Sequence, residues 1–323
     1  MSRKPDTYSP PYQNLDPAAA GARLGDPVDT ARFAKAASFC ERGRSDLAKR
    51  GYSPDGKKRL RKFSTWEICR YLIPVATAHL RRVLKGNPDL PQGEGAGGSK
   101  WFTLEEVISL RDHFSKEGMA SKEYRPYRPD GAPAKVTAVA NFKGGVGKTS
   151  TAAHLAMAAA LDGYKVLVVD LDSQGSMTSI MGCTVEDEWS TVFPLLAKDY
   201  AQHLQQENTV RVAAGEAPLP LDETLREALT VEAKDVIQTT HWPNIDLIGA
   251  QLNLYWAEFQ VPVWRMGARG WPLWDALSNF LENEGVLQDY DVIILDTPPA
   301  LGYLPINALA AADILLVPLG ASF

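Results

Sequence analysis

Ten residues near the middle of the sequence combine three glycines with two lysines. The stretch NFKGGVGKTS, residues 141–150, follows an apolar run and precedes an alanine-rich one. A strand, a glycine turn and a helix leave unpaired backbone N–H groups at the helix N-terminus, where they attract phosphate. Lys148 can reach the β- and γ-phosphates of a nucleotide, and the Thr149 hydroxyl can ligate magnesium. The stretch predicts a phosphate-binding loop. The alternative is a flexible turn with two solvated lysines.

Two further apolar runs end in carboxylates that could serve the same site. VLVVDLDSQGSMT is a predicted buried strand that ends with Asp170 and Asp172. From the alternation of side chains along a strand we expect Asp170 on one side and Asp172 on the other. YDVIILDTPPALG delivers Asp296 to the carboxyl edge of the sheet, where α/β sheets bind ligands. An ordinary strand-end acid is the alternative for Asp172, and for Asp170 the two interpretations weigh equally.

The pattern from Lys135 onward is strand, glycine turn, helix, strand, with later strands in NIDLIGA, DVIILDT and DILLVPL. This alternation predicts an α/β fold with a mainly parallel, doubly wound sheet. Together with the predicted phosphate-binding loop it indicates the P-loop NTPase type. The 123 residues between Asp172 and Asp296 exceed a minimal crossover, so we expect a helical insertion over 183–275. Its tryptophans could form a partner surface, but core packing is favoured: Trp242, Trp256, Trp264, Trp271 and Trp274.

Composition indicates a soluble globular protein: of 323 residues 45% are hydrophobic and 23% charged, with a net charge of -5. Residues 42–85 nevertheless carry thirteen Lys or Arg against three acids, a local charge of +10 that favours a polyanionic partner. Three distant cysteines match neither a disulfide framework nor a zinc spacing. With no secretory signal and no uninterrupted apolar span, we expect a cytoplasmic protein without a membrane partner.

The basic segment also has the pattern of a small DNA-binding domain. In FSTWEICRYLIPVATAHLRRVLKG, Ser64 and Glu67 form a capping box that opens a helix, and Pro74 separates it from a second helix. GEGAGGSKWFT follows as a predicted β-wing, and Thr103 with Glu106 caps a third helix. The residues expected to contact DNA are Thr77, Arg81, Arg82, Lys85 and Lys100. The alternative is a helical docking or dimerisation module whose charges are solvated.

The stretch KGGVGKTS resembles the deviant Walker A motif of the ParA/MinD family of P-loop ATPases. The basic segment resembles the MerR-type winged helix-turn-helix of large plasmid-type members, the RepA group of repABC replicons among them. The sequence departs from the usual patterns at Phe142, where a standard loop has glycine, and at Ser173, where the family usually has proline.

The resemblance implies ATP and Mg²⁺ as cofactors and assigns roles to individual residues. Lys148 would serve its own nucleotide, whereas Lys143 would reach across a dimer to the partner's ATP, much as an arginine finger does. Asp172 would place the attacking water and join Thr149 and Asp296 at the magnesium ion, and TPPALG would sense the γ-phosphate. Catalysis would therefore rest on Lys143, Lys148 and Asp172. The nucleotide contacts would be Lys143, Gly144, Gly145, Val146, Gly147, Lys148, Thr149 and Ser150.

The domains follow from these patterns: a flexible arm over 1–30, a mostly helical, winged helix-turn-helix domain over 31–114, a linker over 115–134, and a P-loop ATPase domain over 135–323. Because family members continue beyond the strand in ADILLVPLGASF, we expect that domain to be incomplete, with the adenine contacts beyond Phe323 and weak hydrolysis of ATP.

The implied function is ATP-dependent DNA partition. A homodimer that sandwiches ATP would coat DNA at the nucleoid, a ParB-type protein would stimulate hydrolysis, and the winged domain would repress its own operon. The alternatives are a nucleotide-responsive transcriptional regulator and a MinD-like positioning ATPase.

Overall fold

The computed structural model describes residues 60–95, 100–116, 124, 128, 131–268 and 270–320. The expected arm over 1–30, the helical domain up to residue 59 and most of the expected linker lie outside these ranges. Residues 58–323 form one compact unit.

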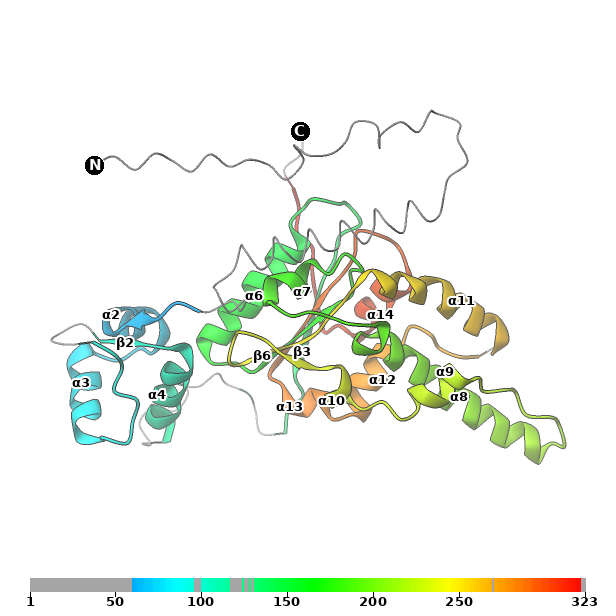
Figure 1. Ribbon diagram of the computed structural model, residues 1–323, viewed down its shortest axis with the longest axis horizontal. Coiled ribbons are helices and arrows are strands. Elements are labelled where there is room, and N and C mark those ends of the chain that lie inside the picture. The colour runs from blue at the N-terminus through cyan, green and yellow to red at the C-terminus, as the bar shows by residue number, and fades with distance from the viewer. Residues whose placement is uncertain are drawn as a thin grey trace, which may run out of the picture. The chain divides into compact units, whose positions relative to one another are not determined.

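A six-stranded sheet forms the centre of the C-terminal part, with the strand order β5-β6-β4-β7-β3-β8 (Figure 1). β5 pairs with β6 in antiparallel orientation, and all other pairs of this sheet are parallel. The strands are β3 (Lys135–Val139), β4 (Val166–Asp170), β5 (Gln238–Thr239), β6 (Ile245–Ile248), β7 (Val292–Asp296) and β8 (Ile314–Leu316). The predicted mainly parallel α/β sheet is confirmed.

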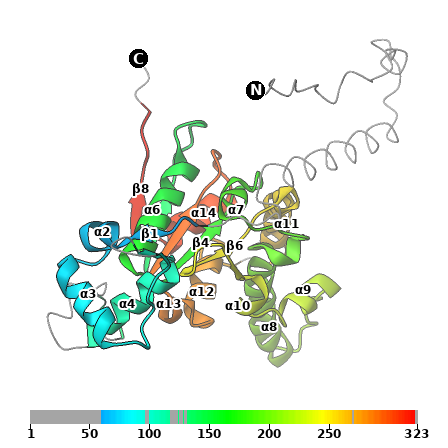
Figure 2. The same ribbon diagram turned by 60° about the vertical axis from the view of Figure 1, so that its left-hand side comes forward.

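Helices cover both faces of the sheet (Figures 1 and 2). Along β7, Ile294 packs into the core under one layer of helices, and Ile293 and Leu295 pack into the core under the other. The first layer is α6 (Lys148–Asp162) and α7 (Ser176–Met181). The second is α8 (Phe193–Ala213), α11 (Ala257–Gly267), α12 (Ala276–Asn283), α13 (Val286–Asp289) and α14 (Tyr303–Ala311). Strands buried on both faces explain the continuous apolar runs in the sequence.

Short elements complete this part: η3 (Glu188–Ser190), α9 (Glu223–Ala228), α10 (Ala233–Val236) and η4 (Leu252–Trp256). The expected helical insertion over 183–275 is thus mostly helical. Its tryptophans divide between two environments. Trp264 and Trp271 are 6% and 1% exposed in the core, as expected, whereas the expectation is wrong for Trp256 and Trp274, which are 67% and 45% exposed. Within the described ranges no helix is both long and apolar enough to cross a membrane.

The residues before the sheet form a small helical unit with its own apolar core, which includes Ile68, Leu80, Phe102 and Leu110. Its elements are β1 (Phe63–Ser64), α2 (Thr65–Glu67), the π-helical turn η2 (Ile68–Leu72), α3 (Thr77–Gly86), β2 (Trp101–Phe102) and α4 (Leu104–Lys116). Both predicted capping boxes are present, at Ser64 with Glu67 and at Thr103 with Glu106. β1 pairs with β2, and Glu94 forms a bridge with Trp101. The winged helix-turn-helix itself stays a prediction.

One buried arginine joins this helical unit to the P-loop domain. Arg111 of α4 is 6% exposed. Its guanidinium donates hydrogen bonds to the carbonyls of Leu72, Tyr124 (3.0 Å) and Leu161 (2.9 Å). Leu72 and Leu161 lie in the last turns of η2 and α6, where helix carbonyls have no partner within the helix. Burial lowers the pKa of Arg111 from its ordinary value, and the charge of Asp162 raises it in part.

The turn after β4 enters α7 at a glycine that has no room for a side chain. Gly175 has a φ of 61°, and a Cβ there would lie 2.8 Å from the carbonyl oxygen of Ala250. Because the neighbour is backbone in a close-packed region, it cannot move aside at small cost. Both the left-handed conformation and the lack of space therefore require glycine.

We expect Gly175→Ala to lower the free energy of unfolding by about 2–3 kcal/mol, through left-handed strain and overlap with Ala250. Gly215→Ala is the matched control, because its φ is 80° but nothing lies within 4 Å of its Cβ position. Only the conformational strain of about 1 kcal/mol then remains. Urea unfolding of the nucleotide-free protein measures both values. Equal losses would show that packing against Ala250 does not limit this position.

Candidate nucleotide-binding site

The parallel register brings the predicted site residues to one edge of the sheet. Asp170 at the end of β4 is in register with Asp296 at the end of β7, and Asp296 is in register with Val139 of β3. Strands in register lie about 4.8 Å apart. The Thr297 hydroxyl donates to the Val139 carbonyl oxygen at 2.9 Å, which ties the segment after β7 to the start of the loop after β3. The Asp296 side chain thus lies between Asp170 and the glycine loop.

The loop after β3 is built to leave its backbone open. Gly145 and Gly147 have φ of 74° and 84°, and nothing lies within 4 Å of the Cβ position at either residue. The Asn141 side chain holds the base of the loop, since its Oδ1 accepts from the Lys143 N–H at 2.9 Å and its Nδ2 donates to the Pro318 carbonyl at 2.8 Å. A loop of left-handed glycines with open space along the backbone fits a phosphate group.

The two lysines of the loop occupy different environments. Lys148, the first residue of α6, is only 7% exposed, and its ammonium group donates to the Lys143 carbonyl at 3.4 Å. Lys143 is exposed. The first cation is therefore held under the loop, and the second is presented at the surface.

Asp296 is a buried carboxylate that has the Thr149 hydroxyl nearby but no hydrogen bond of ordinary geometry to the described residues. The residue is 0% exposed, and among the described residues no donor meets hydrogen-bond geometry to either carboxylate oxygen. Burial and the charge of Asp170 raise the pKa of Asp296 to about 7, and the nearby Thr149 hydroxyl and Lys148 ammonium offset this only in part. Buried acceptors are nearly always satisfied in native proteins, so these oxygens fit a ligand that carries hydrogen-bond donors.

A hydrated magnesium ion fits this observation, because its coordinated waters would donate to the Asp296 oxygens. In the described part of the chain no three His, Cys, Asp or Glu side chains gather into a group that could hold a metal ion. That also fits Mg²⁺, which usually keeps several waters and takes its other oxygens from nucleotide phosphates. Thr149 lies close enough to Asp296 to affect its pKa and could supply a hydroxyl ligand.

Asp170, by contrast, is saturated. It is 0% exposed and accepts from the Thr178 N–H (2.9 Å), the Thr178 hydroxyl (2.8 Å) and the Asp172 N–H (3.1 Å). The Thr178 hydroxyl in turn accepts from the Ala250 N–H at 2.8 Å. Burial raises the pKa of Asp170 to about 6 against these hydrogen bonds. The arrangement assigns Asp170 a structural role: it holds the turn that carries Asp172.

Asp172 lies just beyond β4 and is partly exposed, and its Oδ1 accepts from the Gln174 N–H at 3.0 Å. The two acids do lie in different environments, as expected, but the reason given for this was wrong. Positions two apart on a strand share a face, so alternation does not separate them. They differ because β4 ends at Asp170 and the chain then turns.

Sequence reasoning missed one carboxylate near the site, Glu258 of α11. Its oxygens accept from the N–H groups of Tyr303 (2.7 Å) and Leu304 (3.1 Å), the first residues of α14. It thereby caps the helix that follows the loop after Asp296. The sequence does hold one signal, since Gly302 supplies no side-chain cap to α14. Which distant carboxylate would fill that position could not be read from it.

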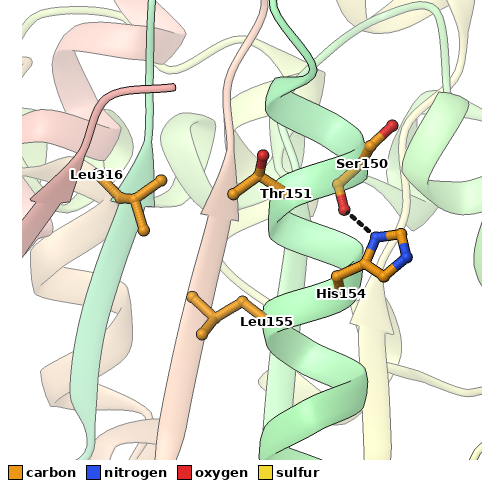
Figure 3. A pocket seen from close by; sticks show the side chains of 5 residues that line it. All are labelled: Ser150, Thr151, His154, Leu155 and Leu316. Atoms are coloured by element: carbon orange, nitrogen blue, oxygen red, sulfur yellow. Dashed lines mark hydrogen bonds between the residues drawn. The ribbon is translucent and has the colours of Figure 1, made fainter. Parts of the chain in front are cut away.

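Ser150, a predicted nucleotide contact, lies in the first turn of α6. It is exposed and lines a pocket of about 480 Å³ together with Thr151, His154, Leu155 and Leu316, between α6 and β8 (Figure 3). The His154 ring nitrogen Nδ1 lies 2.7 Å from the Ser150 carbonyl oxygen. Two of these five residues, Leu155 and Leu316, are apolar, and the pocket does not include Asp296 or Lys148.

The predicted DNA contacts lie on the helical unit. Arg81, Arg82 and Lys85 are exposed on α3, whereas Thr77 and Lys100 are partly buried. Two other cations counted in the basic segment are engaged within the chain. Arg61 forms an ion pair with Glu67 (2.8 Å), and Lys62 forms one with Glu94.

We expect Asp296→Asn to stabilise the nucleotide-free protein at pH 8 while weakening magnesium-dependent nucleotide binding. A carboxyl with a folded pKa of about 7 and an ordinary value of 3.8 favours folding at low pH and loses that contribution as pH rises through 7. The gain in melting temperature should be at least about 3 °C at pH 8 and shrink as the pH is lowered toward 5.

Thermal melts between pH 5 and 8 measure this, with Asp289→Asn, an exposed acid on α13, as the control. A gain that grows at low pH would contradict the burial argument.

Comparison with known proteins agrees with this geometry. A family model described as an AAA domain matches residues 134–323. A protein provisionally named replication protein A from Sinorhizobium fredii is 32% identical over 291 residues, which cover 84% of this chain and 60% of that relative. The chromosome partitioning protein ParA of Caulobacter vibrioides is 31% identical over 191 residues, 59% of this chain and 58% of its own length.

A solved structure described as a partition protein has the same fold. It is 21% identical, covers 88% of this chain and 70% of its own, and has a TM-score of 0.52. The chain spans about 60% of the length of the curated relatives named above. The family model matches more than half of the chain, and the glycine loop, the strands and the acids of the chain form one site. The chain therefore belongs to this AAA-domain family, among the ParA/MinD-type P-loop ATPases.

Proposed function

We propose that this chain is the nucleotide-binding part of an ATP-dependent DNA-partition ATPase of the large plasmid type. The observation that carries the proposal is the pairing of an open glycine loop and a buried Lys148 with Asp296, whose buried oxygens have no hydrogen bond of ordinary geometry to the described residues. The names of the relatives support partition as the process, because one is a chromosome partitioning protein and another is a partition protein.

ATP and magnesium would bind at the carboxyl edge of the sheet. The N–H groups of the loop and the Lys148 ammonium would hold the phosphates, and Thr149 and Asp296 would hold the ion, Asp296 through water. Bound magnesium would supply neutralisation of the negative charge that develops on the phosphate oxygens. Asp172, partly exposed where the chain turns after β4, would orient the attacking water. Hydrolysis is then phosphoryl transfer to water, for which positioning and charge stabilisation are the main requirements.

Lys143 would act on the nucleotide of a second copy. It lies on the same loop as Lys148 but at the surface, while Lys148 already occupies the inner side of the loop. An exposed cation on a flexible stem can reach phosphate charge in a neighbouring molecule, as an arginine finger does when it acts in trans. ATP would thereby join two copies into a homodimer.

The helical unit would bind DNA through α3, on which Arg81, Arg82 and Lys85 are exposed. We propose that Thr77 and Lys100 lie at the border of this contact. Operator binding would let the protein repress its own operon, and the ATP-bound dimer would associate with the nucleoid. A ParB-type protein is the proposed activator of hydrolysis.

Two lysine substitutions should separate the two roles. Lys148→Ala should weaken nucleotide binding at least about tenfold, because it removes the buried cation of the chain's own site. Lys143→Ala should leave binding to the monomer within about threefold but abolish ATP-dependent dimers and lower hydrolysis about 100-fold or more.

A fluorescent ATP analogue, sedimentation with ATP or ADP, and phosphate release measure the three quantities. Lys116→Ala, an exposed lysine at the end of α4, is the control and should match the parent. A Lys143→Ala protein that dimerises and hydrolyses normally would refute the trans assignment.

A further inference from the structure

The structure exposes a row of large apolar side chains on η4 and α11. Tyr255, Trp256, Phe259, Val263 and Met266 are 57%, 67%, 51%, 58% and 82% exposed, and we name them the aromatic face. Tyr255 and Trp256 contact Phe259, with ring centroids 5.1 and 5.9 Å away. Spacings of three, four and seven residues place these side chains along one side of the helix.

The aromatic face is unusual because the opposite side of the same segment is already buried. Leu254, Ala257, Val261 and Trp264 are between 0% and 6% exposed and belong to the main core. The segment thus has apolar side chains on two sides, with Gln260 and Arg265 between them, whereas a surface helix typically has one apolar side. The exposed row presents roughly 600 Å² of apolar area, at the upper limit of the largest patch on ordinary monomers. An exposed apolar patch of this size is typical of an interaction surface.

The aromatic face starts at the edge of the sheet where the nucleotide would bind. β6 is parallel to β4 in register, so both end at this edge, and η4 begins four residues after β6 ends at Ile248. The connecting segment packs against the site, since the Ala250 N–H donates to the Thr178 hydroxyl that binds Asp170. In Figure 1, α11 runs from there along the outside of the second layer, next to α14.

Glu258 links the aromatic face to the loop after Asp296. It lies in the same helical turn as Trp256 and Phe259 but faces inward, where it accepts the Tyr303 and Leu304 N–H groups. The segment 297–302 is therefore held between β7, which ends at Asp296, and an anchor on α11. A partner that shifts α11 would shift this anchor as well.

We infer that a second copy of this chain covers the aromatic face when ATP is bound, and that Glu258 is the positioning residue that couples this contact to the loop after Asp296. The inference rests on the proposed ATP-dependent dimer. A second copy is the partner that fits, because the aromatic face has no charged residue to match a charged partner. The face also starts at the sheet edge where the two copies would meet. Two such faces give roughly 1,200 Å², the lower limit of a specific interface before any nucleotide contact is added.

The test of the surface uses Phe259→Asp, which would place a carboxylate in the interface of each copy. Val210→Asp is the matched control, because Val210 is a 69% exposed apolar residue on α8. With ATP we expect the parent and the control to dimerise, and Phe259→Asp to dissociate at least about 30-fold more readily. Binding of a fluorescent ATP analogue to the monomer should remain within about twofold of the parent. In the parent, burial of Trp256 in the dimer should shift its fluorescence to the blue when ATP is added. The shift is measured as the difference between the parent and Trp256→Phe, and it should be absent in Phe259→Asp.

Each other outcome overturns the inference in a distinct way. If Phe259→Asp dimerises like the parent, the aromatic face lies outside the dimer, and the proposed function stands without it. If the parent binds ATP but never dimerises, the proposed dimer fails and the inference fails with it. If Trp256 is already protected from acrylamide quenching in the nucleotide-free monomer, another segment of the same chain covers the face.

The coupling is tested at Glu258 itself. We expect Glu258→Ala to lower kcat about tenfold with KM within about twofold, because the loop after Asp296 loses its anchor while the phosphate loop is untouched. Glu258→Gln keeps one acceptor oxygen, so its kcat should lie between those of the parent and Glu258→Ala. An unchanged kcat, or an equal loss in nucleotide affinity, would show that Glu258 only supports the fold.

Discussion

The constraint on which the site depends is the burial of Asp296 beside Asp170 with too few protein donors for both. Asp170 accepts from Thr178 and Asp172, whereas Asp296 has the Thr149 hydroxyl and the Lys148 ammonium nearby but no hydrogen bond of ordinary geometry to the described residues. Placing two carboxylates side by side in the interior costs free energy unless cations or hydrogen bonds compensate. The glycine loop, Lys148 and Thr149 surround Asp296 on the remaining side. The buried charges at this site are therefore fully compensated only when a ligand with cations or hydrogen-bond donors binds.

The local features of this arrangement could be predicted from the sequence, and its neighbours in space could not. The apolar runs that end in Asp170 and Asp296, and the glycines before Lys148, are each signals of a few consecutive residues. The strands, the helix after the loop and the capping boxes were therefore predicted correctly. That β7 lies between β4 and β3 depends on strand order, which no local pattern encodes. The role of Glu258 depends on a contact across 45 positions.

The tryptophans show the same limit. Trp256 and Trp264 lie on one short segment with similar neighbours in sequence, yet the first is exposed and the second is in the core. An apolar residue on a helix with two apolar sides gives no periodic signal that says which side faces the sheet. Only the packing of α11 against the second layer decides it, and this packing also sends Glu258 inward to α14.

Arg111 has a consequence for how the protein loses its structure. A single guanidinium serves carbonyls from the helical unit and from the far end of α6, the helix that starts at Lys148. If either side melted alone, the charge would lose part of its hydrogen bonding while still shielded from water, and the freed carbonyls would lose their donor. Calorimetry should accordingly show one cooperative heat-absorption peak for residues 60–320, in place of the two that separable modules would give.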